Sequence, residues 1–168
     1  MTILRRGVWI GGLVLAGVIA VTIPAARGDA AQGNADDILN HFKYGSVGTE
    51  ERVGIPYWIW RVLPIVFADK LPNRPGQGYE RIGFIPDGGP NGGPIGTTEK
   101  VNRVSLVGLN CATCHSGTVR AERNAPRQIV LGMPGNQMDL QAYARFLTAC
   151  ANDPRFTAPV LINAIKRE

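Results

Sequence analysis

Residues 111–115 read Cys-Ala-Thr-Cys-His, and the rest of the chain is interpreted around this stretch. Residues three apart on a helical turn lie on one face, so we expect the thiols of Cys111 and Cys114 to point the same way. Two such thiols can form thioethers with the two vinyl groups of one haem, and His115 can bring an imidazole nitrogen to the iron. The two residues between the cysteines are small enough to let the backbone lie close to the porphyrin edge. The motif therefore predicts one covalently bound haem c, with His115 as the proximal iron ligand.

Three other interpretations of the motif explain less of it. A thioredoxin-like pair of cysteines needs a surrounding strand–helix–strand pattern, which the sequence does not show. A structural zinc site needs four ligands, and only Cys150 and His41 remain to join these residues, at no usual spacing. A disulfide between the two cysteines of the motif leaves the adjacent histidine unexplained.

The first 30 residues have the order of an export signal. Arg5 and Arg6 form a short basic region, an uncharged run covers residues 7–24, and small alanines follow. This order is typical of a secretory signal peptide, and the run is also nearly long enough to span a bilayer uncleaved. We therefore expect a signal peptide or an N-terminal membrane anchor over residues 1–30, and a c-type haem domain over residues 31–168. Both alternatives place the domain in the periplasm or at the extracytoplasmic face of the bacterial inner membrane.

Length and charge limit the kinds of partner. A chain of 168 residues suits one domain, and the net charge of +5 comes with no basic run or basic amphipathic helix. We therefore expect no nucleic-acid partner, a redox protein as partner, and membrane association only through residues 7–24. The last predicted helix meets the C-terminus without a stop signal, which favours a domain truncated at that end.

Helix signals dominate the pattern of the domain. Helices are predicted within residues 31–54, from residue 57 after Pro56, from residue 140 and from residue 158. In the third of these, Cys150 falls on an apolar stripe with Leu140, Tyr143 and Leu147, so it is expected to be a buried core thiol. The second contains Trp58 and Trp60, which are interpreted as core packing, with a wall of the haem crevice as the alternative. The predicted fold is mainly α, a cytochrome c-like haem domain with long Gly/Pro-rich loops, preceded by an apolar export or anchor helix.

Three segments carry weaker signals. Thirteen of the 25 residues of segment 72–96 are glycine or proline, which excludes a regular element and favours a loop that wraps the haem edge. Residues 97–107 fit a helix through their valine spacing and a strand through their alternation, and both alternatives stay open. Residues 116–131 are expected to be mostly irregular, with a short apolar run at 129–131.

The ligand opposite His115 decides what the iron can do. Met133 lies between Gly132 and Pro134, in a rigid turn that can present its thioether, and is the first candidate for distal ligand. An open or water-bound site is the next alternative, followed by Met138 and His41. If the iron is open, a distal acid–base group is needed, and the candidates upstream are His41, Glu50 and Glu51.

Short stretches along the chain match one known family. They are Phe42-Lys43-Tyr44-Gly45-Ser46, Gly54-Ile55-Pro56-Tyr57-Trp58, Val107-Gly108-Leu109-Asn110-Cys111 and Gly132-Met133-Pro134. With the haem motif, they resemble the N-terminal haem module of bacterial di-haem c-type cytochromes related to rubber oxygenase and, more distantly, to cytochrome c peroxidase. The resemblance implies a mainly helical, loop-rich fold and a redox role, but selects no substrate. Members of the family carry a second haem motif further on, and because this sequence has none, a two-haem mechanism is not expected.

Three functions are consistent with these features. The first is a periplasmic electron carrier with one haem. The second is an open-site haem enzyme of peroxidase or oxygenase type. The third is a haem subunit that docks in a membrane redox complex, suggested by the N-terminal segment and the Trp58–Trp60 pair.

Overall fold

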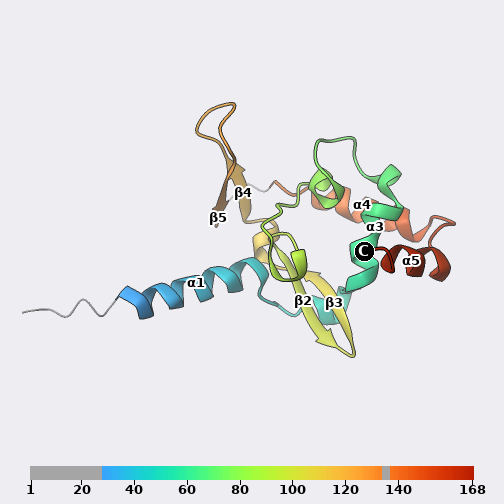
Figure 1. Ribbon diagram of the computed structural model, residues 1–168, viewed down its shortest axis with the longest axis horizontal. Helices are drawn as coiled ribbons and strands as arrows, with labels where there is room; N and C mark the ends of the chain where they lie inside the picture. The colour runs from blue at the N-terminus through green and yellow to red at the C-terminus, as the bar shows by residue number, and fades with distance from the viewer. Residues whose placement is uncertain (1–27, 134–136) are drawn as a thin grey trace, which may run out of the picture.

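The computed structural model describes residues 28–133 and 137–168 (Figure 1). Its α-helices are α1 (Gly28–Tyr44), α2 (Glu50–Val53), α3 (Tyr57–Val66), α4 (Leu140–Ala151) and α5 (Ala158–Ile165). Its strands are β1 (Ile55–Pro56), β2 (Thr97–Asn102), β3 (Val104–Leu109), β4 (Ser116–Val119) and β5 (Gln128–Leu131). Short 3-10 turns complete it: η1 (Ala68–Lys70), η2 (Gly78–Ile82), η3 (Pro90–Gly92) and η4 (Cys111–Thr113).

The expectation of a mainly α, cytochrome c-like domain is wrong, because two antiparallel sheets carry the centre of the chain. The predicted apolar helix before the domain lies outside the described residues. Among the residues that are described, no helix is both long enough and apolar enough to cross a membrane. The helices predicted upstream of residue 54 and from residues 57, 140 and 158 are present as α1, α3, α4 and α5.

The larger sheet has the strand order β1-β3-β2 and resolves the ambiguity of residues 97–107 in favour of strands. Val101 pairs with Ser105 across a tight turn, in which Arg103 takes a φ of 61°. Val107 is buried, whereas Val101 is 77% exposed at the tip of the hairpin. Val101 and Val107 share one face of the sheet, because Val101 pairs with Ser105, and Val101 is exposed because it lies at the end of the hairpin.

A second hairpin, β4–β5, occupies the segment that was expected to be irregular. Thr118 pairs with Ile129 and Val119 with Gln128, and residues 120–127 connect the strands. β-branched residues on both sides of the polar connection favour paired strands.

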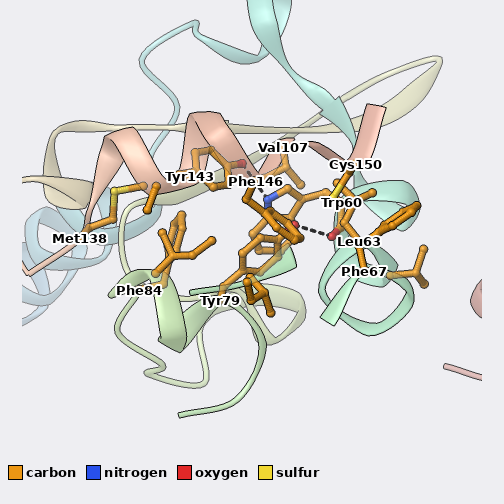
Figure 2. Packing of buried hydrophobic residues seen from close by; sticks show 14 of the residues in the cluster. Trp60, Leu63, Phe67, Tyr79, Phe84, Val107, Met138, Tyr143, Phe146 and Cys150 are labelled. Atoms are coloured by element: carbon orange, nitrogen blue, oxygen red, sulfur yellow. Dashed lines mark hydrogen bonds between the residues drawn. The ribbon is translucent and has the colours of Figure 1, made fainter. Parts of the chain in front are cut away.

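The main core lies between α3, η2, α4 and α5 (Figure 2). Trp60 stacks on Tyr79 at 4.4 Å between ring centroids, and its indole N–H donates to the Tyr143 hydroxyl at 3.0 Å. The Tyr79 hydroxyl in turn donates to the Trp60 carbonyl at 2.7 Å, so the polar tips of these buried aromatic residues are satisfied. Trp60 is thus a core residue, whereas Trp58 is 51% exposed, and the two do not form one surface.

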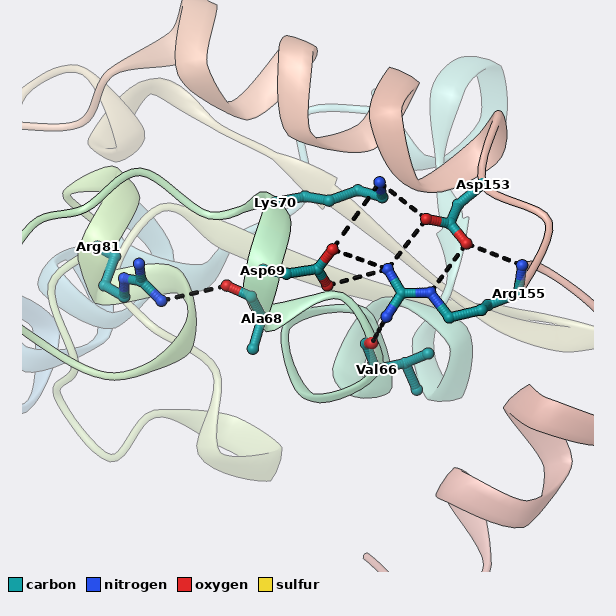
Figure 3. A network of polar contacts seen from close by, with 7 residues as sticks. All are labelled: Val66, Ala68, Asp69, Lys70, Arg81, Asp153 and Arg155. Carbon is teal, nitrogen blue, oxygen red and sulfur yellow. Dashed lines mark hydrogen bonds and ion pairs between the residues drawn. The ribbon is translucent and has the colours of Figure 1, made fainter.

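Charged side chains hold the turn between α4 and α5 against η1 (Figure 3). Lys70 Nζ lies 2.8 Å from Asp153 Oδ2, and Arg155 Nη2 lies 2.9 Å from Asp69. Arg155 also donates to the Val66 carbonyl at 3.2 Å. Hydrogen bonds from Arg155 and Lys70 hold the pKa of Asp153 well below its usual range. This network fixes the direction in which α5 leaves α4 and returns to pack on α3.

Candidate functional site

The motif Cys-Ala-Thr-Cys-His forms one helical turn at the end of β3. The amide of Cys114 donates to the Cys111 carbonyl at 3.2 Å, and the amide of His115 donates to the same carbonyl at 3.0 Å. Cys111 is exposed, Cys114 is half-buried, and both are free thiols. His115 is exposed, and its imidazole has no hydrogen-bond partner among the described residues. The three groups predicted to hold a haem are therefore accessible and not engaged elsewhere in the described protein.

The two residues between the cysteines face the opposite way, into the protein. Ala112 is 1% exposed and packs in a small second core with Ile85 and Ile95, which Phe42 and Leu131 flank. Thr113 is also buried, and its hydroxyl donates to the Gly96 carbonyl at 2.7 Å. The turn therefore has an inner side made of its spacer residues and an outer side made of its reactive residues.

Asn110 holds this turn in place, and sequence analysis missed it. Its side-chain oxygen accepts the amide proton of Ala112 at 2.9 Å, which caps the turn. Its side-chain amide donates to the carbonyls of Phe42 and Gly45, each at 3.1 Å, which attaches the end of α1. An asparagine directly before a predicted helical turn is a capping signal, and this signal could have identified it.

A glycine allows the Gly/Pro-rich segment to support the turn from behind. Gly96 has a φ of 88°, and a Cβ at this position would collide with the backbone of Thr113. The Gly96 carbonyl accepts from the backbone amide of Asn110 at 2.9 Å. Because only glycine combines this φ with so close an approach, residue 96 fixes the distance between the two segments.

Hairpin β4–β5 continues directly from His115. The His115 carbonyl accepts from the Gly132 amide at 2.7 Å. Met133 is half-buried, and its thioether lies where a Cβ on Gly117 would be. The structure therefore brings Met133 beside the strand that follows His115, and Gly117 provides the space for it. Whether Met133 binds iron stays a prediction.

Exposed apolar side chains lie on both elements next to the turn. On α1, Ile38 is 61% and Leu39 is 45% exposed. On the hairpin, Val119 is 42% and Ile129 is 38% exposed. Figure 1 shows that α1 extends away from the rest of the molecule, while its last turn packs beside η4. Ile129 pairs with Thr118 and therefore points to the face of the hairpin opposite to that of Val119, so these exposed side chains do not form one apolar surface.

The other candidates for iron ligand or acid–base group lie elsewhere. Met138 is 4% exposed in the main core. His41 is exposed on α1, and Glu51 pairs with Lys100 at 2.5 Å. Glu50 is 1% exposed, and accepts from the Ser46 hydroxyl at 2.9 Å. None of these four side chains is among the groups that the structure packs against the motif.

Glu50 is a buried carboxylate under β3. Burial would raise its pKa, but hydrogen bonds and the charge of Lys100 outweigh burial, so the pKa lies below its ordinary value. The group is therefore ionised at neutral pH, and it closes the space beside Gly108. A structural role under the sheet accounts for these contacts.

Cys150 contrasts with the cysteines of the motif. It is 1% exposed in the main core, as predicted, and burial raises the pKa of its thiol to about 11. Within the described part of the chain, no group of three or more His, Cys, Asp or Glu side chains is placed to hold a metal ion. Comparisons with models of protein families, with curated proteins and with solved structures give no match.

Proposed function

We propose that this chain is a c-type haem protein that transfers electrons outside the cytoplasm. Cys111 and Cys114 would hold one haem covalently, and His115 would be its proximal iron ligand. One observation supports this more than any other: on a single turn, two free thiols and an unpartnered imidazole are accessible while the two spacer residues are buried.

The residues of the turn fit a haem in their chemistry and in their placement. Bound there, the haem would supply an iron that changes its oxidation state by one electron. The chain's own part is to present two thiols and a neutral nitrogen ligand from one rigid turn, which Asn110 and Thr113 hold through buried hydrogen bonds.

Two further features support the compartment and the partner. The basic, apolar and small-residue order of residues 1–30 is that of an export segment, and c-type haem is attached after export. We therefore place the domain in the periplasm or at the outer face of the bacterial inner membrane. An electron carrier needs a redox protein as partner, and residues 31–168, with 15 Lys and Arg against 12 Asp and Glu, carry a net charge of +3, which suits an acidic one.

The proposal is tested by expression in a bacterium that attaches c-type haem. We expect His115→Ala to keep the thioethers but to change the spin state and Soret band of the ferric protein, because the nitrogen ligand is lost. His41→Ala is the matched control, since it removes the other histidine, and its spectrum should equal that of the unchanged protein. Identical spectra for both variants would remove His115 as ligand.

A specific observation favours an open-site haem enzyme as the second candidate. Met133, which would supply the second iron ligand of an electron carrier, is instead packed against Gly117 on the strand that follows the proposed ligand His115. Met138, another candidate for the second iron ligand, is buried in the main core and is not available for that role. Carbon monoxide added to the ferrous protein separates the two functions, because a closed, low-spin electron carrier does not take it up readily. Rapid uptake, unchanged in Met133→Leu, would select the enzyme.

A further inference from the structure

A cavity separate from the haem motif lies between the larger sheet and the Gly/Pro-rich segment. Its volume is about 310 Å³, and three aromatic side chains line it, those of Tyr44, Tyr57 and Trp60. Glu99 and Val107, cross-strand partners on β2 and β3, form its floor together with their neighbours. This volume is at the lower end of the range for small-molecule pockets, so it suits a ligand of a few heavy atoms.

Loop residues 90–92 form the opposite wall and are fixed there. The side-chain amide of Asn91 donates to the Glu99 carboxylate. The Asn91 carbonyl accepts from the Tyr57 hydroxyl at 2.9 Å and from Arg61 Nη1 at 3.2 Å. The segment that was expected to wrap a haem edge thus covers this cavity with residues near its C-terminal end, among them Pro90, Asn91 and Gly93.

The charge of Glu99 is not neutralised within the described structure. Its carboxylate accepts hydrogen bonds from Asn91 and Ser105, which are both neutral. The nearby cations are paired with other carboxylates: Arg61 with Glu168 at 3.0 Å, Lys43 with Asp87 at 2.7 Å, and Lys100 with Glu51 at 2.5 Å. No ion pair among the described residues includes Glu99, and no cationic side chain lines the cavity.

We propose that this cavity binds a small organic cation of the ammonium class, such as a choline-sized quaternary amine. Aromatic rings attract cations through their negative faces, and a half-buried carboxylate adds direct attraction. A neutral ligand of the same shape would gain only the apolar contact. A bound cation would also neutralise a half-buried charge that has no cationic partner. The site is independent of the haem proposal, because it shares neither the thiols nor the histidine of the motif.

Isothermal titration of the purified full-length protein with choline chloride tests the proposal. The neutral probe is 3,3-dimethylbutan-1-ol, which has the shape of choline without its charge. We expect saturable binding of choline, and binding of the neutral probe at least about tenfold weaker, a difference of about 1.4 kcal/mol in binding free energy. Equal affinities, or no saturable heat with choline at millimolar concentrations, would overturn the proposal.

Glu99→Gln is the variant that isolates the charge. The amide keeps an oxygen that can accept from Asn91 and a group that can bond to Ser105, so the loop stays attached. We expect choline affinity to fall at least about tenfold, while the neutral probe binds as before. Glu122→Gln, on the connection of the β4–β5 hairpin, removes the same charge at a distant place and should change neither affinity. A uniform change for both probes, or an equal loss in the two variants, would contradict the proposed site.

A second variant keeps the test valid if Glu99→Gln does not fold. Tyr57→Leu removes one ring from the wall, and we expect it to weaken choline more than the neutral probe by a few-fold. Circular dichroism shows whether each variant is folded. A preference for choline over the neutral probe that stays the same in Tyr57→Leu would exclude an aromatic contribution and contradict the proposal.

Discussion

Cysteine is buried in the main core and accessible on the turn that contains residues 111–115. Cys150 is 1% exposed between aromatic side chains, and burial keeps its thiol protonated. Cys111 and Cys114 are free on an outer face, while the unreactive Ala112 between them is 1% exposed. Stability and reactivity are therefore separated along the chain: the main core buries a thiol as packing, and the turn buries its spacer residues while its two thiols and His115 stay accessible.

The two regions also differ in how they are held together. The main core uses large apolar and aromatic side chains, such as Phe67 and Phe146, which are almost completely buried. The second core has three buried apolar residues, Ile85, Ile95 and Ala112, and adds buried hydrogen bonds from Asn110 and Thr113. Polar contacts fix direction more strictly than apolar contacts, which suits the proposal that this turn presents ligands to one bound group.

The largest expected effect is on covalent haem. Cys111→Ser combined with Cys114→Ser should abolish thioether-bound haem, and change the free energy of unfolding of the apoprotein by less than about 0.5 kcal/mol, because these thiols are not core contacts. Haem staining after denaturing electrophoresis measures covalent haem. Unfolding in urea measures the free energy of unfolding. Cys150→Ala is the control and should keep the stain. A stain that survives in the double variant would show that haem is held elsewhere.

Truncation in the main core should be the largest effect on stability. Phe146 is 1% exposed, and Phe146→Ala is expected to lower the free energy of unfolding by about 3–5 kcal/mol through lost burial and a cavity. Phe156→Ala is the matched control, because that ring is 39% exposed and its loss should cost far less. Urea unfolding followed by tryptophan fluorescence measures both. Equal costs would mean that this core does not dominate stability.

Asn110→Ala probes the boundary between the two regions. It removes the cap of Ala112 and leaves the Phe42 and Gly45 carbonyls without these partners, so we expect a loss of about 1–3 kcal/mol in stability. The yield of covalent haem should also fall, because the turn is no longer fixed. Asn152→Ala, which removes one exposed hydrogen bond at the end of α4, is the control. An unchanged yield of covalent haem in Asn110→Ala would show that Asn110 does not position the turn.

The smallest effect is the alkaline dependence of stability from Cys150. Burial raises the pKa of the folded thiol to about 11, above the value of about 8.5 for a free cysteine. The unfolded chain loses this proton first, so the contribution to stability is complete below about pH 8.5 and is lost as the pH rises towards about 11. Urea midpoints across this range should fall more steeply in the unchanged protein than in Cys150→Ala. Parallel slopes would mean that the thiol is not protected by burial.

Sequence patterns predicted the individual helices better than they predicted how the elements pack together. Apolar periodicity and capping residues indicated α3, α4 and α5. Of the predicted stripe on α4, Tyr143 and Cys150 are buried, Leu147 is half-buried and Leu140 is 52% exposed. The β4–β5 hairpin was missed, because paired strands depend on contacts between distant residues such as Thr118 and Ile129. The predicted fold class failed for the same reason: helix signals are local, and strand pairing is not.

The residues of the motif could be predicted from the sequence, but most of the contacts that hold the motif in place could not. Spacing alone predicted that Cys111, Cys114 and His115 belong together, and all three are accessible. The capping role of Asn110 was open to prediction, but its bonds to the end of α1 and the role of Gly96 depend on segments more than ten residues away in the chain. The cavity beside Glu99 was unpredictable for the same reason, since three separate segments enclose it.

Mass spectrometry of the peptide that contains residues 111–115 tests the central claim most directly. The protein should be isolated from the envelope of a bacterium able to attach c-type haem, and digested without reduction. The account predicts one haem on this peptide, bound through both cysteines, with Cys150 unmodified on another peptide. A peptide with two free thiols, or with a disulfide between them, would contradict it.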